Sequence, residues 1–390
     1  MASALERILQ QSAEDAERLG LEHMPREVNQ QPQVWRQTAE YIISQKDKIS
    51  DILGKGQQLI LSGAGTSDYV GRSVETLLRK RLGKDVVSRP STDLVTDPEG
   101  LFPKKPFVLV SFARSGNSPE GNAAFELANQ LRPEFAHHIV VTCNPDGVLA
   151  RLAKESKTPA LLLLMPPETN DKALAMTSSY SSMVVAAQGF GYLDEPETYK
   201  SQVEQLAKGA EGFLAAAADP MEELAGEGFA RGVFLGSGAL FGAAWEGHLK
   251  VQEMTAGKVI CKAESMLGLR HGPMAVVHDD TVVFTFLSSD PYVAKYELDL
   301  LREIKLKGIG YKTVAVCQKA TTEVEELVDI VLESKTELPD FVLPPLFIVP
   351  AQLLALFKSL AFGLKPDNPS EGGVINRVVQ GVQIYPYPSA

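Results

Sequence analysis

The chain has 390 residues, 44% of them hydrophobic and 22% charged, and it carries a formal net charge of −11. This length and composition are those of a soluble globular protein with room for two domains of about 150 residues each. Lysines and arginines do not gather in any block, so a nucleic-acid-binding surface, which needs clustered cations, is not expected.

The cysteines and the N-terminus bear on the compartment. Cys143, Cys261 and Cys317 lie among apolar residues, and three cysteines are too few for a disulfide framework in a chain of this length. They indicate buried thiols in a reducing compartment, so a cytoplasmic protein is predicted. The N-terminal segment contains Glu6 and Glu14 and is typical of an amphipathic helix, not of a signal peptide.

The first half of the chain predicts helices followed by an α/β module. Residues 1–50 are expected to form N-terminal helices, the second of which starts near Pro32, because proline suits the first helical turn. Between residues 51 and 190, the apolar segments QLILS, FVLVSFA, HIVVT and ALLLL alternate with helical patterns. Such strands predict a parallel sheet that is covered by helices on both faces.

The second half of the chain repeats this plan. Residues 191–228 are rich in alanine and glutamate and predict a helical linker. Residues 229–364 form the second predicted module, with strands in GVFLGSGA, TVVFTFLSS, TVAVCQ and DIVLES. Residues 365–390, which include Arg377, are too rich in proline and glycine for a helix and are predicted to lie over the active site. The fold class is therefore α/β, with two tandem doubly wound parallel sheets.

One segment, residues 343–364, is apolar over the length of a membrane span. It contains prolines near its start, and it also contains Gln352 and Lys358. We therefore predict a buried strand-turn-helix in this segment and expect no association with a membrane.

Three stretches of the two modules recur at one spacing. LSGAG matches LGSGA, SFARS matches TFLSS, and VVTCN matches VAVCQ. The pairs Ser62 and Gly236, Phe112 and Phe286, and Cys143 and Cys317 are each 174 residues apart. A constant spacing over three strand-and-loop units indicates an ancient duplication of one α/β module, so the differences between the copies point to separate tasks.

The first copy contains two loops that suit a phosphate. After its first strand, Gly65 permits a sharp turn, and Thr66 and Ser67 place hydroxyls beside the amides of a helix start. The loop after the next strand has the same character and contains Arg114, Ser115, Gly116 and Ser118. Because the carboxyl ends of parallel strands form the usual ligand edge of such folds, a phosphomonoester site is predicted. The alternative is that these small residues only cap helices.

The second copy contains a helix face that suits proton transfer. Glu246, Lys250 and Glu253 are four and three residues apart, which places them on one face of a helix. A solvated, salt-bridged face would show the same spacing. The helix follows GSGAL, the counterpart of the first phosphate loop, and this position favours the catalytic interpretation.

A histidine follows this helix in the sequence. His271 precedes Gly272-Pro273, which enforce a turn, and a histidine on a rigid turn can transfer protons near neutral pH. His248 lies on the helix but off the acidic face, and we predict a structural role for it. No spacing of histidines, cysteines and acids suggests a metal site, and no cofactor is predicted.

These motifs together resemble a known family. GAGTS and ARSGNS resemble the phosphate loops of the sugar isomerase (SIS) domain. WEGHLKVQE, AES and RHGP look like the catalytic segment of the isomerase half of glucosamine-6-phosphate synthase, and REVNQQPQVW is similar to its entry helix. The forms RSGNSPE, ESMLGLRHGP and PDNPS are similar to AgaS-type proteins, described as galactosamine-6-phosphate deaminase/isomerases or tagatose-6-phosphate ketose/aldose isomerases.

The resemblance implies a role for each matching residue. Glu253 would move the proton between C2 and C1, Lys250 is the lysine one turn before it, and His271 would open the sugar ring. Thr66, Ser67, Ser115 and Ser118 match the phosphate ligands, whereas Arg114 replaces a glutamine usual in the synthase. With Gly65 and Gly116 of the same loops, these residues are the predicted substrate-binding positions. Arg377 lies near the place of a tail lysine, whereas the roles of Glu246 and Glu264 are left open. Since the family histidine acts across a subunit interface, a homodimer or higher homo-oligomer with a shared active site is expected.

The implied reaction converts galactosamine 6-phosphate to tagatose 6-phosphate and ammonia, with a small sugar phosphate as the partner molecule. Glucosamine-6-phosphate deamination and simple aldose/ketose isomerisation remain alternatives, because both use the same proton transfer. A non-enzymatic sugar-phosphate-binding regulator is the alternative of another class; it would keep the loops and would not need Glu253 or His271.

Overall fold

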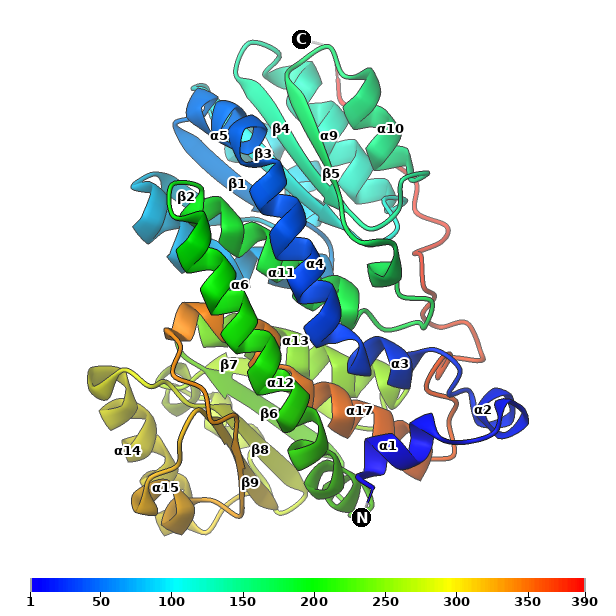
Figure 1. Cartoon of the computed structure of the whole chain (residues 1–390), viewed down its shortest axis with the longest axis vertical. Helices are drawn as coiled ribbons and strands as arrows, with labels where there is room; N and C mark the ends of the chain where they lie inside the picture. The colour runs from blue at the N-terminus through cyan, green and yellow to red at the C-terminus, as the bar shows by residue number, and fades with distance from the viewer. Residues whose placement is uncertain (1, 389–390) are drawn as a thin grey trace. The chain divides into compact units, whose positions relative to one another are not determined.

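The computed structural model of the protein describes residues 2–388 and consists of two compact units (Figure 1). Each unit is assembled from separate stretches of the chain. Unit 1 contains the chain up to Gln33, Asp171–Thr177 and Gln202–Val374. Unit 2 contains Val34–Asn170, Ser178–Ser201 and the chain from Ile375 onward.

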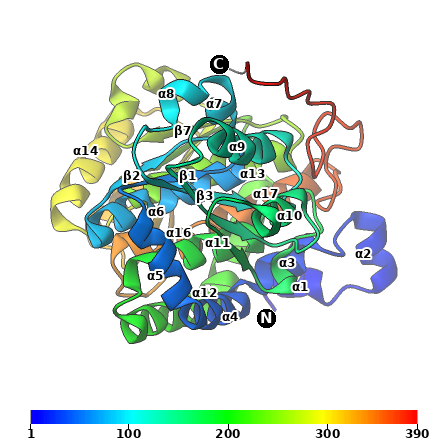
Figure 2. The same ribbon diagram turned by 90° about the horizontal axis from the view of Figure 1, so that it is seen from above.

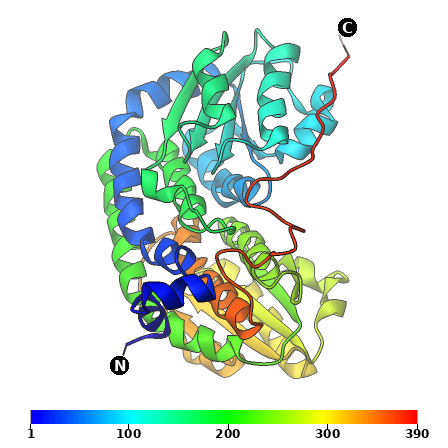
Figure 3. The ribbon, with the colours of Figure 1, turned by 90° about the vertical axis from the view of Figure 1, so that its right-hand side faces the viewer.

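Unit 2 contains a parallel sheet with the strand order β2-β1-β3-β4-β5. Its strands are β1 Gln58–Ser62, β2 Asp85–Ser88, β3 Phe107–Ala113, β4 Ala136–Thr142 and β5 Ala160–Leu164. Its helices are α5 Lys46–Lys55, α6 Thr66–Leu82, α7 Ser91–Thr96, α8 Pro98–Leu101, α9 Pro119–Leu131, α10 Val148–Glu155 and α11 Ser178–Gly189, with short 3-10 turns η1 Pro167–Thr169 and η2 Phe190–Tyr192. Helix α5 packs on one face of β3, β4 and β5, whereas α9 and α10 pack on the other (Figures 2 and 3).

Unit 1 contains a second parallel sheet, with the order β10-β9-β8-β6-β7. Its strands are β6 Arg231–Gly236, β7 Ile260–Ser265, β8 Thr281–Phe286, β9 Lys312–Cys317 and β10 Ile330–Glu333. Its helices are α1 Ala4–Leu9, α2 Ala13–Leu19, α3 Met24–Asn29, α13 Ala239–Met254, α14 Pro291–Lys307, α15 Thr322–Leu327, α16 Pro344–Phe347 and α17 Val349–Ala361, with 3-10 turns η3 Gly268–Arg270, η4 Pro273–Val276 and η5 Asp340–Val342. Helices α13 and α17 pack together beside β6 and β7, and α14 and α15 close a second apolar layer over β6, β8 and β9.

Two helices include residues of both units. Helix α4, Gln31–Ser44, begins in unit 1 and continues in unit 2. Helix α12, Pro196–Ala225, begins in unit 2 and continues in unit 1, with Pro220 inside it. The segment predicted as a helical linker is therefore mostly one long helix.

The two sheets have the same topology. Numbered in chain order within each sheet, both run 2-1-3-4-5, with the first strand beside the third. Gly65 and Gly238 precede α6 and α13 with φ of 56° and 55° and ψ of −127° and −126°. These matching glycines are 173 residues apart, not 174, so the predicted constant spacing is wrong by one residue at this loop.

Several elements differ from the prediction. The edge strands β2 and β7 were not expected, because β2 is only four residues long and β7 alternates apolar residues with Lys262 and Glu264. The N-terminal segment forms two short helices and not one, since Ser12 caps α2 by accepting the N–H of Asp15. Beyond α17 the described chain has no helix or strand, as its composition predicted (Figure 3).

The segment of membrane-span length contains the helices α16 and α17 and no strand, so the predicted strand within it is wrong. Pro344–Ala361 has a mean hydropathy of 1.4, and 89% of it is buried inside the protein. Lys358 on its last helix is buried; its Nζ donates to the carbonyl of Ala225, 3.0 Å away, and lies 4.1 Å from the ring centre of Phe229. These contacts are those of a core helix with its one cation satisfied.

Candidate active site

The first predicted phosphate loop lies between β1 and α6 of unit 2. Gly65 makes the turn at a positive φ, and Thr66 and Ser67 occupy the first helical turn with buried side chains. The N–H groups of Ser67 and Asp68 donate to the carbonyls of Ala64 and Gly65 at 3.2 and 2.9 Å, which tightens this turn. The hydroxyls thus lie at a helix N-terminus at the carboxyl edge of the sheet, where an anion is favoured.

The second predicted loop follows β3, the strand beside β1 in the sheet. Gly116 has a φ of 66°, and Ser118 caps α9 by accepting the N–H of Gly121 at 3.4 Å. The hydroxyl of Ser118 donates to Glu120 Oε2 at 3.0 Å, and the Oγ of Ser115 accepts the N–H of Asn117 at 3.2 Å. Both loops therefore lie at the carboxyl edge of the sheet, between β1 and β3. The connection from β1 leads to one side of the sheet and that from β3 to the other, and ligands usually bind at such a point in open α/β sheets.

Residues that sequence reasoning missed brace this second loop. Asn144 Nδ2 donates to the carbonyl of Ser115 at 2.9 Å, and the N–H of Leu149 donates to Gly116 at 2.9 Å. A Cβ on Gly147 would lie 2.5 Å from the same Ser115 carbonyl, so only glycine permits this approach. The asparagine directly after the apolar run VVTC was the available sequence signal.

The predicted tail residue Arg377 meets the second loop within unit 2. Arg114 is buried, and its Nη2 donates to the carbonyl of Arg377 at 2.8 Å. The guanidinium of Arg377 donates to Asn170 Oδ1, also at 2.8 Å. The tail is therefore fixed beside the Arg114 loop by its backbone and by its side chain.

The corresponding positions of unit 1 do not suit a phosphate. By the matched glycines, Ala239 and Leu240 replace the hydroxyl residues of the first loop. At the second loop, Asp290 caps α14, and Asp340 accepts the N–H and hydroxyl of Ser289 at 3.0 and 2.6 Å. Carboxylates at these helix starts repel an anion, so the two modules differ in the groups that they place at this edge.

Helix α13 of unit 1 carries the predicted proton-transfer face. Lys250 Nζ lies 3.3 Å from Glu246 Oε1 and 2.7 Å from Glu253 Oε2, so the three side chains form one ion-paired row. The side chains of Lys250 and Glu246 are 1% and 0% exposed, whereas that of Glu253 is 24% exposed. A solvated helix face is thereby excluded, and Glu253 is the member of the row that solvent or a substrate can reach.

The two histidines differ in their burial. Nδ1 of His248 on α13 donates to the Trp245 carbonyl, 2.5 Å away, and burial lowers the pKa of His248 to about 4. It is therefore a neutral, structural side chain near pH 7. His271 follows the 3-10 turn η3, and its backbone N–H donates to the carbonyl of Gly268 at 3.0 Å. His271 is exposed.

Glu264, whose role the sequence left open, ends strand β7 beside β6. Its Oε1 accepts the N–H of Ser265 at 3.0 Å, and its Oε2 lies 3.3 Å from Lys262 Nζ. A Cβ on Gly268 would lie 2.8 Å from Glu264 Oε1, so the glycine lets the carboxylate fold back over the turn that leads to His271.

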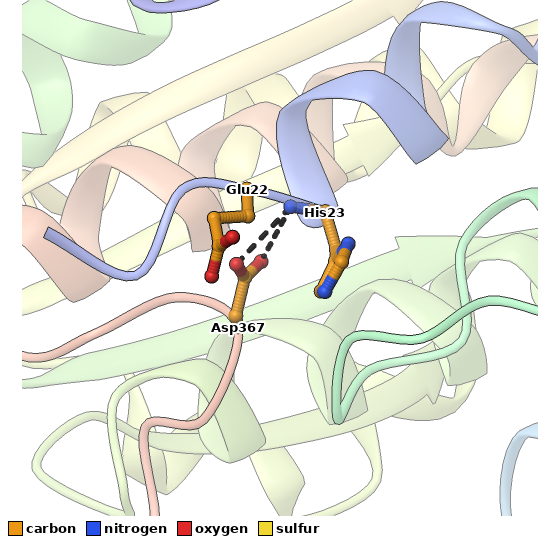
Figure 4. A group of neighbouring side chains, drawn as sticks. All are labelled: Glu22, His23 and Asp367. Carbon is orange, nitrogen blue, oxygen red and sulfur yellow. Dashed lines mark hydrogen bonds between the residues drawn. The ribbon is translucent and has the colours of Figure 1, made fainter. Parts of the chain in front are cut away.

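A group of possible metal ligands lies at the N-terminal end of α3. Glu22, His23 and Asp367 offer atoms within 4.8 Å of one another (Figure 4). The carboxylate of Asp367 accepts the N–H groups of His23 and Met24, the latter at 2.8 Å. The hydrogen bonds drawn in Figure 4 come from the backbone nitrogen of His23 and not from its ring, so this group is explained as a helix cap supplied by the tail.

A buried carboxyl group, that of Glu27, links helix α3 to another segment of unit 1. Glu27 on α3 accepts the N–H groups of Lys172, at 2.5 Å, and Ala173, at 3.3 Å. Burial, with the nearby carboxylate of Asp171, raises the pKa of Glu27 to about 8. A protonated Glu27 therefore holds the segment Asp171–Thr177 against α3 at neutral pH.

The chain matches a known domain and is similar to named proteins over most of its length. Residues 230–359 match the SIS domain. A D-galactosamine-6-phosphate deaminase AgaS of Escherichia coli is 39% identical over 93% of this chain and 95% of that protein. A second D-galactosamine-6-phosphate deaminase AgaS, from Shewanella sp., is 35% identical over 96% of this chain and 95% of its own length.

The solved structures agree with this grouping. The tagatose-6-phosphate ketose/aldose isomerase of Escherichia coli superposes with a TM-score of 0.85 at 36% identity, over 94% of this chain and 97% of that chain. The protein is thus built on the SIS fold. It belongs to the AgaS family of SIS-domain proteins, as the motifs suggested.

Proposed function

We propose that this protein is an enzyme that converts galactosamine 6-phosphate to tagatose 6-phosphate and ammonia. The ion-paired row of Glu246, Lys250 and Glu253 is the observation that carries this proposal, because it leaves one partly exposed carboxylate on an otherwise buried helix face. The names of the AgaS relatives support the substrate. The names also favour an enzyme over a sugar-phosphate-binding regulator.

The proposed reaction begins with the phosphate. Thr66 and Ser67, with the loop of Ser115, Gly116 and Ser118, would bind the phosphate, so that a non-reacting group orients the sugar. Arg114 would add positive charge and hold the tail through Arg377. Binding at a helix start with hydroxyl donors requires no metal for the phosphate itself.

Proton transfer follows ring opening, in which His271 would act as the acid and base. Glu253 would remove the C2 proton of the open aldose while O1 gains a proton, which gives an enamine. Return of the proton to C1, with loss of one proton from the amine nitrogen, then gives an imine at C2 and a hydroxyl at C1. Water would then replace the imine nitrogen, and the products are the ketose phosphate and ammonia. Because Lys250 is buried between two carboxylates, we assign it to positioning Glu253.

The test is ammonia release by the full chain from galactosamine 6-phosphate and, separately, from glucosamine 6-phosphate. Glu253→Gln should lower kcat by about 100-fold or more, the usual range for loss of a general base. Glu223→Gln, an exposed carboxylate on α12, is the matched control and should retain full activity. Full ammonia release by Glu253→Gln would disprove the assignment.

Simple aldose/ketose isomerisation is the second candidate, because the solved Escherichia coli relative carries that name. It uses the same proton transfer and releases no nitrogen. Interconversion of a ketose phosphate and an aldose phosphate that both lack an amine, with no ammonia released from either amino sugar, would therefore favour this candidate.

We also propose a cytoplasmic homo-oligomer with an active site shared between subunits. The exposed position of His271 supports contact with a second subunit, and the buried free thiols of Cys143, Cys261 and Cys317 support a reducing compartment. Dilution to monomers, followed by size-exclusion chromatography and an ammonia assay, should abolish turnover. Full activity of a monomer would contradict the shared site.

A further inference from the structure

Unit 1 contains a cavity of about 1060 Å³ that the proposed reaction does not use. It lies where β8, β9 and β10 end, and Leu287, Ser288, Gln318 and Lys335 are among its lining residues. The carboxyl edge of a parallel sheet is the usual ligand edge of α/β folds, so the position is that of a binding site.

A buried carboxylate lines this cavity. Glu297 on α14 is 1% exposed, and its Oε2 accepts the N–H of Ser288 at 2.8 Å. Its Oε1 is buried and makes no hydrogen bond of ordinary geometry among the described residues. Burial raises the pKa of Glu297 to about 6, although the Ser237 hydroxyl and the Ser288 N–H act in the opposite direction. A buried carboxylate with an unused oxygen is unfavourable unless a ligand completes it.

Two other polar groups of the wall have partners. Gln318 accepts the N–H of Leu338 at 2.6 Å and donates to the Leu338 carbonyl at 2.8 Å. Glu333 accepts the N–H of Ala320 at 2.5 Å. Glu337 also lines the cavity but is exposed, so Glu297 is the buried carboxylate of the wall with an acceptor still to offer.

Unit 2 shows that this carboxylate is not required by the fold. Pro119 and Pro291 begin the equivalent helices α9 and α14, and by this match Phe125 stands where unit 1 has Glu297. Phe125 is buried, and its ring centre lies 4.0 Å from that of His138. An apolar side chain thus satisfies this position in one module, so the carboxylate of the other calls for a separate explanation.

Two lysines also line the cavity. Lys319 and Lys335 line it and are exposed, and Lys335 has a left-handed φ of 54°. The N–H of Lys335 donates to the Gln318 carbonyl at 2.9 Å, which holds this backbone in place. A ligand with a cationic or hydroxyl-rich end and an anionic end would match this charge distribution.

We propose that this cavity is a second, non-catalytic binding site for an amino sugar phosphate, with the amine or hydroxyls at Glu297 and the phosphate at Lys319 and Lys335. The choice of ligand rests on the proposed function, whereas the presence of a site rests on the cavity and on Glu297. Ser237, whose hydroxyl lowers the pKa of Glu297, lies in the loop that begins α13.

The test uses a probe that cannot be turned over. Galactosaminitol 6-phosphate, the C1 alcohol of the amino sugar phosphate, is titrated calorimetrically into the full chain. Two binding sites per chain are expected. Glu297→Gln, which keeps the shape of the side chain and removes its charge, should leave one site, whereas Asp299→Asn, an exposed position on the same helix, should leave two.

A second variant separates loss of the site from loss of the fold. Ala320→Trp should fill the cavity from its wall and also leave one binding event, and thermal melting would confirm that each variant is folded. Galactitol 6-phosphate, which lacks the amine, should bind the second site at least tenfold more weakly. An isotherm that Glu297→Gln leaves unchanged overturns the proposal. Absence of ammonia release by the unaltered enzyme overturns the proposed function instead, and leaves a Glu297-dependent site intact.

Discussion

Replacing Lys250 with methionine tests the buried ion-paired row directly. Methionine approximates the stem of lysine and removes the ammonium, which lies 3.3 Å from Glu246 and 2.7 Å from Glu253. Glu253 is partly exposed and can recover hydration, but Glu246 is 0% exposed and cannot. Removing one partner of a buried pair destabilises a protein by about 3–5 kcal/mol, so a loss of this size is expected for unit 1.

The assay is urea unfolding followed by tryptophan fluorescence. The chain has two tryptophans, and Trp35→Phe leaves Trp245, on α13 itself, as the reporter of unit 1. In this background, adding Glu246→Gln to Lys250→Met should restore most of the lost stability, because the buried charge is then gone.

The matched control for this experiment is an exposed pair. Lys208 and Glu204 on α12 have the same four-residue spacing, with the lysine side chain 69% exposed, so Lys208→Met should cost less than about 0.5 kcal/mol. A loss below about 1 kcal/mol for Lys250→Met, or no recovery with Glu246→Gln, would refute the assignment of the row as a buried electrostatic unit.

Two further predictions concern pH and backbone geometry. Folded Glu27 keeps its proton up to about pH 8, whereas the unfolded chain releases it near 4.5. The free energy of unfolding should therefore fall as pH rises between these values. Glu27→Gln should make the melting temperature depend less on pH over this window, and an unchanged dependence would contradict the raised pKa. Gly65→Ala should destabilise by about 1–3 kcal/mol, because φ is 56° and ψ −127° there, whereas Gly54→Ala in helix α5 should be neutral or slightly stabilising in the same melts. Equal effects at the two glycines would contradict the strain argument.

Local patterns explain what the sequence could predict. Strands of continuous apolar residues, and loops that combine glycine with serine or threonine, are recognisable within about ten residues. Both parallel sheets, and the turns at the two loops that we propose to bind phosphate, were therefore predictable. The spacing of Glu246, Lys250 and Glu253 likewise fixed their common face. Their burial was not predictable, because it depends on which elements pack over α13.

The features that the sequence did not predict depend on contacts between distant residues or on patterns that fit two structures. Asn144 and Asn170 act on Ser115 and Arg377 across 29 and 207 residues of sequence, and no local pattern encodes such contacts. The residues 343–364 are apolar enough for either a buried strand or a buried helix, so periodicity alone could not decide between them. In the sequence, Glu297 is one of several polar residues of an amphipathic helix, and only the folded structure shows the cavity beside it.

The division of the chain into interleaved segments has a consequence for synthesis and for engineering. Unit 1 requires the residues up to Gln33 and also those up to Val374, and unit 2 includes the chain from Ile375 onward. Neither unit can therefore be completed on the ribosome until almost the whole chain has emerged, and both must close long loops before their contacts form. A gene cut between the two sheets would produce two unfinished folding units, so any attempt to study the halves separately should begin from a circular permutant and not from a truncation.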